Sequence, residues 1–313
     1  MANFLRFRSQ DGTVKPIDFL KYRYVSAALS VLILATFVGA YFYKKHTTAD
    51  HHTFNYSVDF TGGIQLLMTF NKPVEGQKIV HILDEKGWPG SVTREFGPAE
   101  HLVRVKKETK DVGQEAEKIR EAILQGLGSD YTATIGQTDS VGVATGSTLR
   151  TKSLWAVCLA LLLMLLYIAL RFWSFAYASG AIVSLFHDAI VVLALFLIFD
   201  KEISMNVIGA ILAVLGYSIN DTIVIFARIR ENVKRMPNTS MYDVINISIT
   251  ETLSRTLLTT FATTLVVIAL FLFGGETLRD LSLALLIGIV FGIYSTIFIA
   301  TPVLYMLYKD KRA

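Results

Sequence analysis

One ionisable side chain, Asp221, lies in the middle of an apolar run. The run from Val207 to Phe226 otherwise has the composition of a membrane span. An ionised carboxylate at the centre of a bilayer costs roughly 2.5–3.5 kcal/mol on insertion scales, and such groups often face a polar interior and move ions or protons. Asp221 is therefore the first candidate for reversible ion or proton binding. The structural alternative is a carboxylate that only hydrogen-bonds a neighbouring helix.

Other polar side chains in apolar runs could work with Asp221. Asp188 could share one proton with it as a coupled pair, and His187 could relay protons. Arg255 could pair with Asp221 when its proton leaves, or it could only anchor the chain at the membrane surface. Asn220 could line the same path or face a packed helix. The fifth apolar segment has threonines that could solvate an ion path, although we favour hydrogen bonds between helices. These threonines are Thr256, Thr259, Thr260, Thr263 and Thr264.

The composition indicates a membrane protein. Of 313 residues, 52% are hydrophobic and only 18% are charged, and the mean hydropathy is +0.47. A soluble domain usually has about 25% charged residues. The net charge of +4 could suggest a nucleic-acid partner. The basic residues flank apolar runs, however, so we interpret them as topology signals and expect no nucleic acid. The single cysteine, Cys158, excludes a disulfide within the chain.

Six apolar segments have about the 20 residues that a membrane-spanning helix needs. The first is longer than the apolar part of a signal peptide and has no small-residue cleavage site, so we expect an uncleaved anchor. The segments are Tyr24–Tyr43, Leu154–Leu170, Phe175–Phe199, Ile203–Phe226, Thr256–Gly274 and Leu281–Leu307.

Lysines and arginines lie mainly on one side of these segments. This bias predicts cytoplasmic termini (residues 1–23 and 309–313), an outer domain over 44–153 and a five-helix membrane region over 154–308. The opposite short loops have only Lys201 and Arg279. Apolar and polar residues alternate between Asn238 and Thr252, which predicts a short amphipathic helix at the cytoplasmic surface. The basic residues on the cytoplasmic side are Arg6, Arg8, Lys15, Lys21, Arg23, Arg171, Arg228, Arg230, Lys234, Arg235, Arg255, Lys309, Lys311 and Arg312.

The outer segment has the patterning of a small α+β domain. Its β-α-β-β-α-β order is typical of a ferredoxin-like sandwich. His46, His51 and His52 precede this domain; they could bind a metal, but we expect a solvated loop and no metal site. The predicted elements are Ile64–Phe70, Gly76–Lys86, Ser91–Phe96, His101–Lys107, Val112–Leu127 and Tyr131–Gln137.

Glycines are expected to shape the backbone at three places. Asp59, Gly62 and Gly63 would form a turn between the first apolar segment and the outer domain, with a structural role for Asp59. Gly288 and Gly292 form a G-x-x-x-G step that fits close helix packing. Gly216 begins the run that contains Asp221.

Several motifs, in their order and spacing, resemble the SecF members of the SecD/SecF protein-export family. Ala227 departs from the pattern, because the family usually has an aspartate before RIREN (228–232). Val143 also departs, because it replaces a usual proline. The resemblance covers nearly the whole chain and includes YSVDFTGG (Tyr56–Gly63), RFWSFAYASGAIVSLFHD (Arg171–Asp188), GYSINDTIVIF (Gly216–Phe226), TLSRTLLTTFATT (Thr252–Thr264) and GIVFGIYSTIFIATP (Gly288–Pro302).

This resemblance implies a fold of the resistance-nodulation-division type, in which SecD supplies a similar six-span half. It implies work in the bacterial inner membrane at the SecYEG channel, on unfolded polypeptides crossing the lipid bilayer, with YajC as a further candidate partner. A gradient of H⁺ or Na⁺ would drive the outer domains. No organic cofactor and no covalent chemistry are implied, and the match to the family's SRTL motif favours a coupling role for Arg255.

Three other interpretations remain open from the sequence. Asp188 and Asp221 could form an intramembrane aspartyl-protease dyad, but Ser-Ile-Asn before Asp221 does not match the G-x-G-D motif of such proteases. A small-molecule or lipid exporter of the same superfamily would typically contain both halves in one long chain. A scaffold of the translocase would keep the spans, and Asp221 would be expendable.

Overall fold

The computed structural model describes residues 16–47, 53–107, 109 and 111–308. The basic residues predicted to orient the two outermost ends, from Arg6 to Lys15 and from Lys309 to Arg312, lie outside the described residues, as do His51 and His52. The chain divides into two compact units. The helical unit contains residues 1–55, 156–201 and 206–313, and the sheet unit contains residues 56–155 and 202–205.

Six candidate membrane spans are present in the described part of the chain, as predicted. Their length and apolar composition match the requirement for crossing a bilayer. The spans are α1 (Arg23–Thr47), α5 (Val143–Phe172), α6 (Phe175–Ile198), α7 (Met205–Arg235), α8 (Met241–Phe273), and a last span made of α9 (Gly275–Ser295), the π-helical turn η2 (Thr296–Ala300) and α10 (Thr301–Leu307).

Several helices extend beyond the predicted apolar segments: α7 continues to Arg235 and α8 begins at Met241. Helix α5 begins at Val143 rather than at Leu154, because helical structure continues through the polar residues that precede the apolar part. Helix α1 continues to Thr47, so His46 lies in its last turn and not in a loop. A one-turn 3₁₀ helix, η1 (Leu20–Tyr22), leads into α1.

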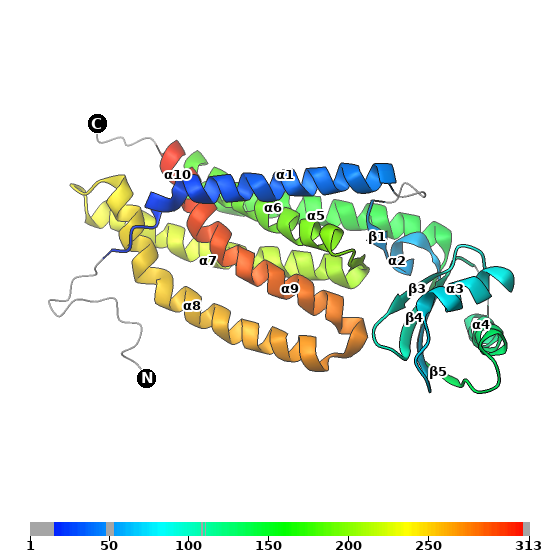
Figure 1. Cartoon of the computed structure of the whole chain (residues 1–313). Coiled ribbons are helices and arrows are strands. Elements are labelled where there is room, and N and C mark those ends of the chain that lie inside the picture. The colour runs from blue at the N-terminus through cyan, green and yellow to red at the C-terminus, as the bar shows by residue number, and fades with distance from the viewer. Residues whose placement is uncertain (1–15, 48–52, 108, 110, 309–313) are drawn as a thin grey trace. The chain divides into compact units, whose positions relative to one another are not determined.

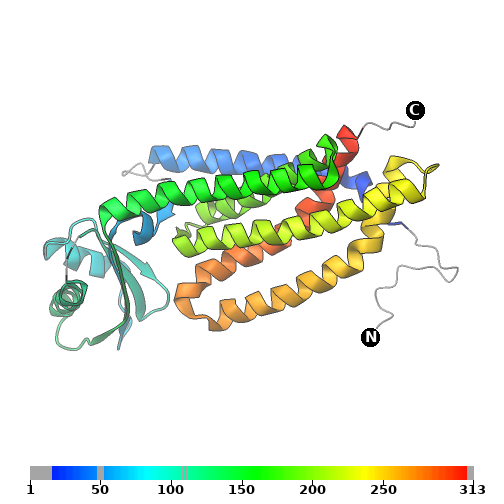
Figure 2. The same cartoon turned by 180° about the vertical axis from the view of Figure 1, so that it is seen from behind.

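Helix α6 is the most buried of the spans. Helices α1, α9 and α10 pack against it, as Figures 1 and 2 show from two sides. Gly180 allows one of these contacts, because a Cβ atom at this position would lie 2.5 Å from the carbonyl oxygen of Ala300. This glycine therefore brings α6 against the end of the π-helical turn.

The segment near 238–252, predicted as a short amphipathic helix, is helical from Met241 but is not a separate element. It forms the first turns of α8, which continues without a break for 33 residues. At 1.5 Å per residue such a helix is about 50 Å long and exceeds the ~30 Å hydrocarbon core. Val244, Ile245 and Ile249 are fully buried within the chain. The position of these first turns at the cytoplasmic surface stays a prediction.

The start of α8 instead holds the segment that precedes α1. The side-chain oxygen of Asn246 accepts hydrogen bonds from the backbone N–H groups of Phe19 and Leu20, at 3.0 and 3.1 Å. The hydroxyl of Thr250 accepts another from the N–H of Ile17, at 3.0 Å. The polar residues of the alternating pattern thus bind backbone groups rather than solvent.

The sheet unit has the predicted ferredoxin-like arrangement. Its antiparallel sheet has the strand order β3-β4-β2-β5, and α3 and α4 cover one face (Figure 1). Apolar residues from β2, such as Leu66 and Met68, form the core with Ile79 of α3 and Ile119 of α4. The elements are β2 (Gly63–Phe70), α3 (Gly76–Glu85), β3 (Val92–Glu95), β4 (Glu100–Val105), α4 (Val112–Leu127) and β5 (Ala133–Val141).

A turn precedes β2 at the predicted place. The short helix α2 (Val58–Thr61) ends at Gly62, and both Gly62 and Gly63 have positive φ angles, 74° and 117°. A Cβ atom on Gly63 would lie 2.4 Å from the carbonyl oxygen of Val105. Glycine is therefore required at position 63 by both the backbone conformation and the close approach of β4.

Candidate functional site: buried carboxylates among the spans

Asp188 is the most deeply buried carboxylate of the helical unit. Its side chain on α6 is fully buried, and the Ser218 hydroxyl on α7 donates a hydrogen bond to its Oδ2 atom at 2.6 Å. Its Oδ1 atom has no hydrogen-bond partner within the described ranges and lies 3.6 Å from Nδ1 of His187. A buried carboxylate with one donor is stable only when it holds a proton or has a cation nearby.

The His187 ring is the neighbouring group that could exchange a proton with Asp188. Both ring nitrogens are buried and have no hydrogen-bond partner among the residues described. The ring packs beside Tyr294, with 5.8 Å between centroids. A neutral imidazole has one donor and one acceptor nitrogen, and neither is used here, so the relay stays a prediction.

Asp221 lies on the same side of α7 as Ser218, one helical turn further along. It is 5% exposed, and in the part of the chain that the structure describes it makes no hydrogen bond or ion pair. Arg255 is exposed on α8 and makes no hydrogen bond or ion pair with Asp221, so the predicted pairing stays a prediction. Among the described residues no hydrogen bond joins Asp188 to Asp221, so the two carboxylates are separate groups.

Three hydroxyl residues near these carboxylates were missed from the sequence. The Thr222 hydroxyl lies 2.9 Å from the Thr296 hydroxyl, and it donates to the carbonyl oxygen of Ser218 at 3.2 Å. Thr296 begins the π-helical turn η2, and such turns often occur at functional sites. In the sequence Ser218 and Thr222 lie on either side of Asp221 and one helical turn apart. This spacing could have predicted that both hydroxyls share a helix face near the carboxylate.

The threonines of α8 divide into two sets. Thr256 and Thr260 are buried, and Tyr217 of α7 donates to the Thr260 hydroxyl at 3.2 Å. Thr259 is exposed, and its hydroxyl donates to the carbonyl oxygen of Arg255 at 3.0 Å. The Thr263 hydroxyl likewise donates within α8, to the carbonyl oxygen of Thr259. The structure therefore brings Thr260, and not Thr259 or Thr263, to α7.

Asn220 does not line this polar region within the chain. It is exposed on α7, and the same face carries Gly209 and Gly216, at which a Cβ atom would meet nothing within 4 Å. This face is open in the helical unit.

The predicted close packing at Gly288 and Gly292 is confirmed. A Cβ atom at Gly288 would lie 2.3 Å from the methyl groups of Val214, and one at Gly292 would lie 3.2 Å from Cβ of Ser218. The two glycines bring α9 against α7 and thereby fix the side chain that donates to Asp188.

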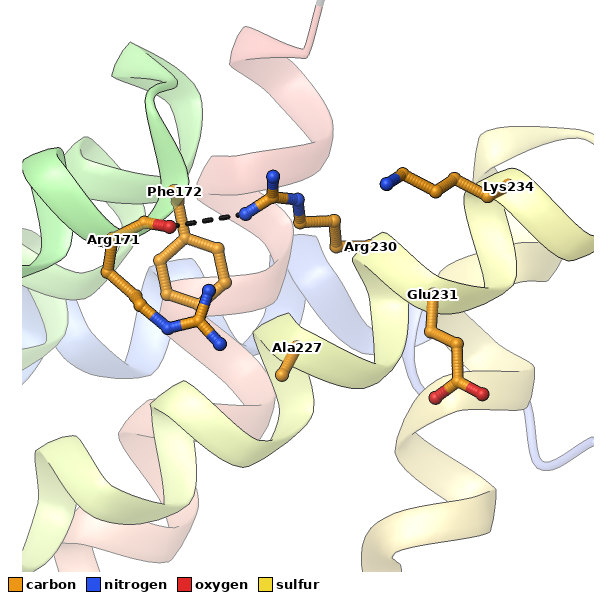
Figure 3. Close-up of a pocket in the computed structure, with 6 residues that line it drawn as sticks. All are labelled: Arg171, Phe172, Ala227, Arg230, Glu231 and Lys234. Carbon is orange, nitrogen blue, oxygen red and sulfur yellow. Dashed lines mark hydrogen bonds between the residues drawn. The ribbon is translucent and has the colours of Figure 1, made fainter.

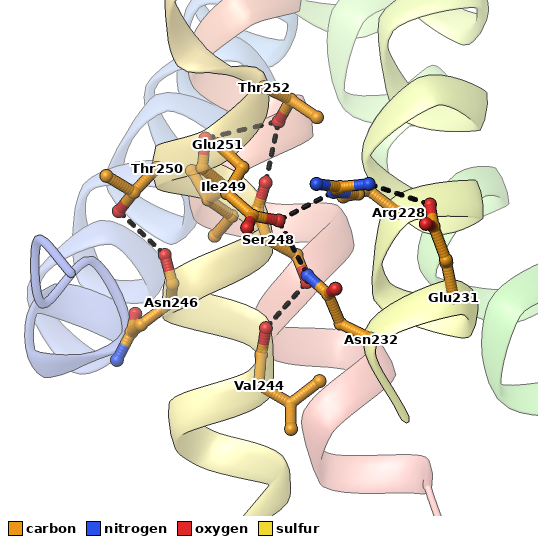
Figure 4. Close-up of polar contacts among 10 residues, drawn as sticks. All are labelled: Arg228, Glu231, Asn232, Val244, Asn246, Ser248, Ile249, Thr250, Glu251 and Thr252. Atoms are coloured by element: carbon orange, nitrogen blue, oxygen red, sulfur yellow. Dashed lines mark hydrogen bonds and ion pairs between the residues drawn. The ribbon is translucent and has the colours of Figure 1, made fainter. Parts of the chain in front are cut away.

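At one end of α7 a charged network joins this helix to α8 (Figure 4). Arg228 donates through Nε to Glu251 at 2.6 Å and through Nη1 to Glu231 at 2.8 Å. The amide of Asn232 donates to Glu251 at 2.8 Å and to the Ser248 hydroxyl at 3.0 Å. These contacts fix the relative position of the two helices that carry Asp221 and Arg255.

The loop between α6 and α7 belongs to the sheet unit. Its strand β6 (Glu202–Ile203) pairs with β1 (Asn55–Tyr56). Glu202 is 5% exposed and lies 2.5 Å from Nη2 of Arg104 and 3.7 Å from Nη1 of Arg94. The backbone N–H of Met205 donates to Asp59 at 2.9 Å. Asp59 therefore has a structural role, and the loop is fastened to the sheet unit.

These features define the class of protein: a multi-pass membrane protein with buried carboxylates in its spans and a ferredoxin-like unit between the first two. The model of the C-terminal region of the protein export membrane proteins SecD and SecF matches residues 119–310, and the SecD/SecF GG motif matches residues 51–74. The chain belongs to the SecD/SecF family.

Relatives of nearly the same length support this assignment. The chain is 37% identical to the protein translocase subunit SecF of Thermodesulfovibrio yellowstonii, over 94% of this chain and 96% of that protein. It is 37% identical to SecF of Pseudomonas aeruginosa, over 93% and 91%. The names of these relatives describe a transport role.

Longer relatives are similar to this chain over one part of their length. The protein translocase subunit SecDF of Thermus thermophilus is 37% identical, and the chain spans 38% of its length. The crystal structure of SecDF from that organism matches with a TM-score of 0.81 and 34% identity, over 93% of this chain and 38% of that one. A SecDF structure in a super-membrane-facing form matches with a TM-score of 0.66 and 34% identity, over 94% and 39%.

Proposed function

We propose that this chain is a SecF-like translocase subunit that uses a transmembrane ion gradient to promote the passage of unfolded secreted polypeptides through a SecYEG channel. The observation that carries the proposal is the pair of buried carboxylates, Asp188 and Asp221, in otherwise apolar helices. Burying an ionised carboxylate in a span is costly, so a protein that only anchors a complex has no physical reason to contain two.

The proposal includes a SecD-like half as partner. The open face of α7, with Gly209, Gly216 and Asn220, offers room for the close approach of another helix. A relative in which both parts are named together, SecDF, supports this partnership. In the complex Asn220 would face the partner's helices. YajC is a further candidate partner.

In the proposed orientation both termini lie in the cytoplasm of a bacterium, and the sheet unit lies on the outer side of the inner membrane. The excess of lysine and arginine on one side of the spans supports this orientation.

The proposed mechanism couples a change of charge to movement. A proton or sodium ion that binds Asp221 removes or balances its charge, and this changes the preferred packing of α7 against its neighbours. One charge moved through 100 mV releases about 2.3 kcal/mol, which shifts a two-state equilibrium about fiftyfold. The loop 202–205 continues into α7 and is fastened to the sheet unit, so it would pass the movement on. No organic cofactor and no covalent step are part of this proposal.

The test is export of a secreted reporter from vesicles that contain the channel and the SecD-like half, with and without this chain. A proton gradient and a sodium gradient are imposed separately. The proposal expects this chain to add a component of export that one of the two gradients drives. If the chain raises export equally with no gradient, it acts as a scaffold and the proposal is wrong.

A further inference from the structure

A pocket of about 330 Å³ lies between the end of α5 and the last turns of α7 (Figure 3). Three cationic side chains border it: Arg171 of α5, and Arg230 and Lys234 of α7. The pocket is at the lower end of the ~300–1,000 Å³ range of small-ligand sites. Its size and charge suit a compact anion.

Among the described residues no carboxylate forms an ion pair with these three cations. Arg171, Arg230 and Lys234 make no ion pair within the described ranges, and Arg230 donates instead to the carbonyl oxygen of Arg171 at 3.2 Å. Glu231 borders the pocket, but it pairs with Arg228 and turns away from Arg230 and Lys234 in Figure 3. Ala227 of α7 also lines the pocket and contributes only a methyl group.

The floor of the pocket is rigid. Phe172 is buried and stacks on Tyr177 with 5.1 Å between ring centroids, and it also packs edge-on against Phe226. The Arg171 guanidinium lies 5.6 Å from the Phe172 ring. One of the three cations, Arg171, therefore lies against a packed aromatic cluster at the edge of the pocket.

The pocket lies where a span meets the membrane surface. Trp173, next in the chain, is 83% exposed, and exposed tryptophans mark the headgroup region of a bilayer. From this end an exposed apolar stripe follows α5 into the membrane, with the spacing of one helical face. The stripe consists of Leu163, Leu166, Tyr167 and Leu170.

We propose that this pocket binds the phosphate group of an anionic phospholipid, with the acyl chains along the stripe on α5. Arginine side chains match phosphate oxygens with paired hydrogen bonds, and basic pockets between membrane helices commonly take anionic headgroups. Zwitterionic lipids share the phosphate but carry a compensating cation, which these three side chains repel. The site is independent of the export function proposed above.

The test measures lipid binding to the purified full-length chain in detergent micelles by native mass spectrometry. Phosphatidylglycerol is compared with phosphatidylcholine of the same acyl chains, and glycerol 1-phosphate and inorganic phosphate are added as competitors. The proposal expects phosphatidylglycerol to bind more tightly than phosphatidylcholine, with little competition from the two water-soluble phosphates. If these phosphates compete at the concentration of the lipid, the ligand is a free phosphate and the lipid assignment is wrong.

Three variants locate the binding. Arg171→Gln keeps the carbonyl oxygen that Arg230 uses, and it should weaken binding about fivefold, as should Arg230→Gln. Ala227→Asp leaves every cation in place but adds a carboxylate beside them, and it should weaken binding by a similar factor. Arg235→Gln is the matched control: it removes a cation from the same helix end that does not border the pocket, and it should change binding less than about twofold.

Three further results would overturn the proposal. One is the same loss of binding in Arg235→Gln as in Arg230→Gln, which would mean that general surface charge holds the lipid. Another is full binding in Ala227→Asp when its thermal unfolding matches that of the unmodified chain. Displacement of the bound lipid by an added SecD-like half would likewise show that a protein, and not a lipid, fills the pocket.

Discussion

Glu202→Gln tests the attachment of the loop between α6 and α7 to the sheet unit. The Glu202 carboxylate is buried and lies 2.5 Å from the Arg104 guanidinium, which also donates to the carbonyl oxygen of Tyr56 at 2.8 Å. The substitution keeps the shape of the side chain but removes its charge. Arg104 is then left as a buried cation without this partner.

The size of the effect follows from burial. Breaking a buried ion pair by removing one partner typically costs about 3–5 kcal/mol. Arg94 lies 3.7 Å from the same oxygen and offsets little, because its longer contact is weaker. We therefore expect the free energy of unfolding to fall by about 3 kcal/mol. The exposed pair of Lys72 and Asp130, 3.8 Å apart, provides the matched control, because Asp130→Asn should cost less than about 1 kcal/mol.

The assay is chemical unfolding of the full chain in detergent, with a double-mutant cycle between Glu202→Gln and Arg104→Gln. If the pair acts as one unit, the double variant should be little less stable than either single variant. The argument fails if Glu202→Gln costs no more than Asp130→Asn, or if the two costs in the cycle simply add.

Three further predictions concern the packing and the charges of both units. Gly288→Ala should lower the free energy of unfolding by roughly 1–3 kcal/mol, because the added methyl group would overlap Val214. Thermal unfolding measures the loss, and an unchanged unfolding midpoint would contradict the close packing of α9 on α7. Ser218→Ala removes the hydroxyl that donates to Asp188 at 2.6 Å, and unfolding should show a loss of roughly 1–3 kcal/mol that adding Asp188→Asn partly restores. The hydrogen bond from Lys107 holds the pKa of Glu115 below its usual range, so its contribution to stability is complete above about pH 4.3 and is lost as the pH falls through the lowered folded-state value. Unfolding measured from pH 6 to pH 2 should show a smaller acid loss in Glu115→Gln, and an unchanged acid loss would refute this.

Local patterns predicted the sheet unit well. Alternation along Gly63–Phe70 and helical spacing along Val112–Leu127 depend only on neighbouring residues, so the strands, helices and their order follow from the sequence. The glycines at 288 and 292 were also predictable, because a G-x-x-x-G step in an apolar run signals close packing.

Contacts between distant residues were not predictable in the same way. Glu202 and Arg104 meet only after the loop pairs with β1, and Ser218 becomes a partner of Asp188 only when α6 and α7 pack together. The contacts at the start of α8 were missed for a related reason. Asn246 binds the segment before α1 and Ser248 binds Asn232 of α7, so polar residues of the alternating pattern make contacts within the chain.

Export of a secreted reporter by Asp221→Asn tests the central claim most directly. The vesicles contain the channel, the SecD-like half and equal amounts of either chain, and the imposed gradient is the one that drives the unmodified protein. Our account predicts that the variant assembles normally and keeps the basal export but loses the component that depends on the gradient. Full gradient dependence in the variant would contradict the account and would move the coupling site to the partner.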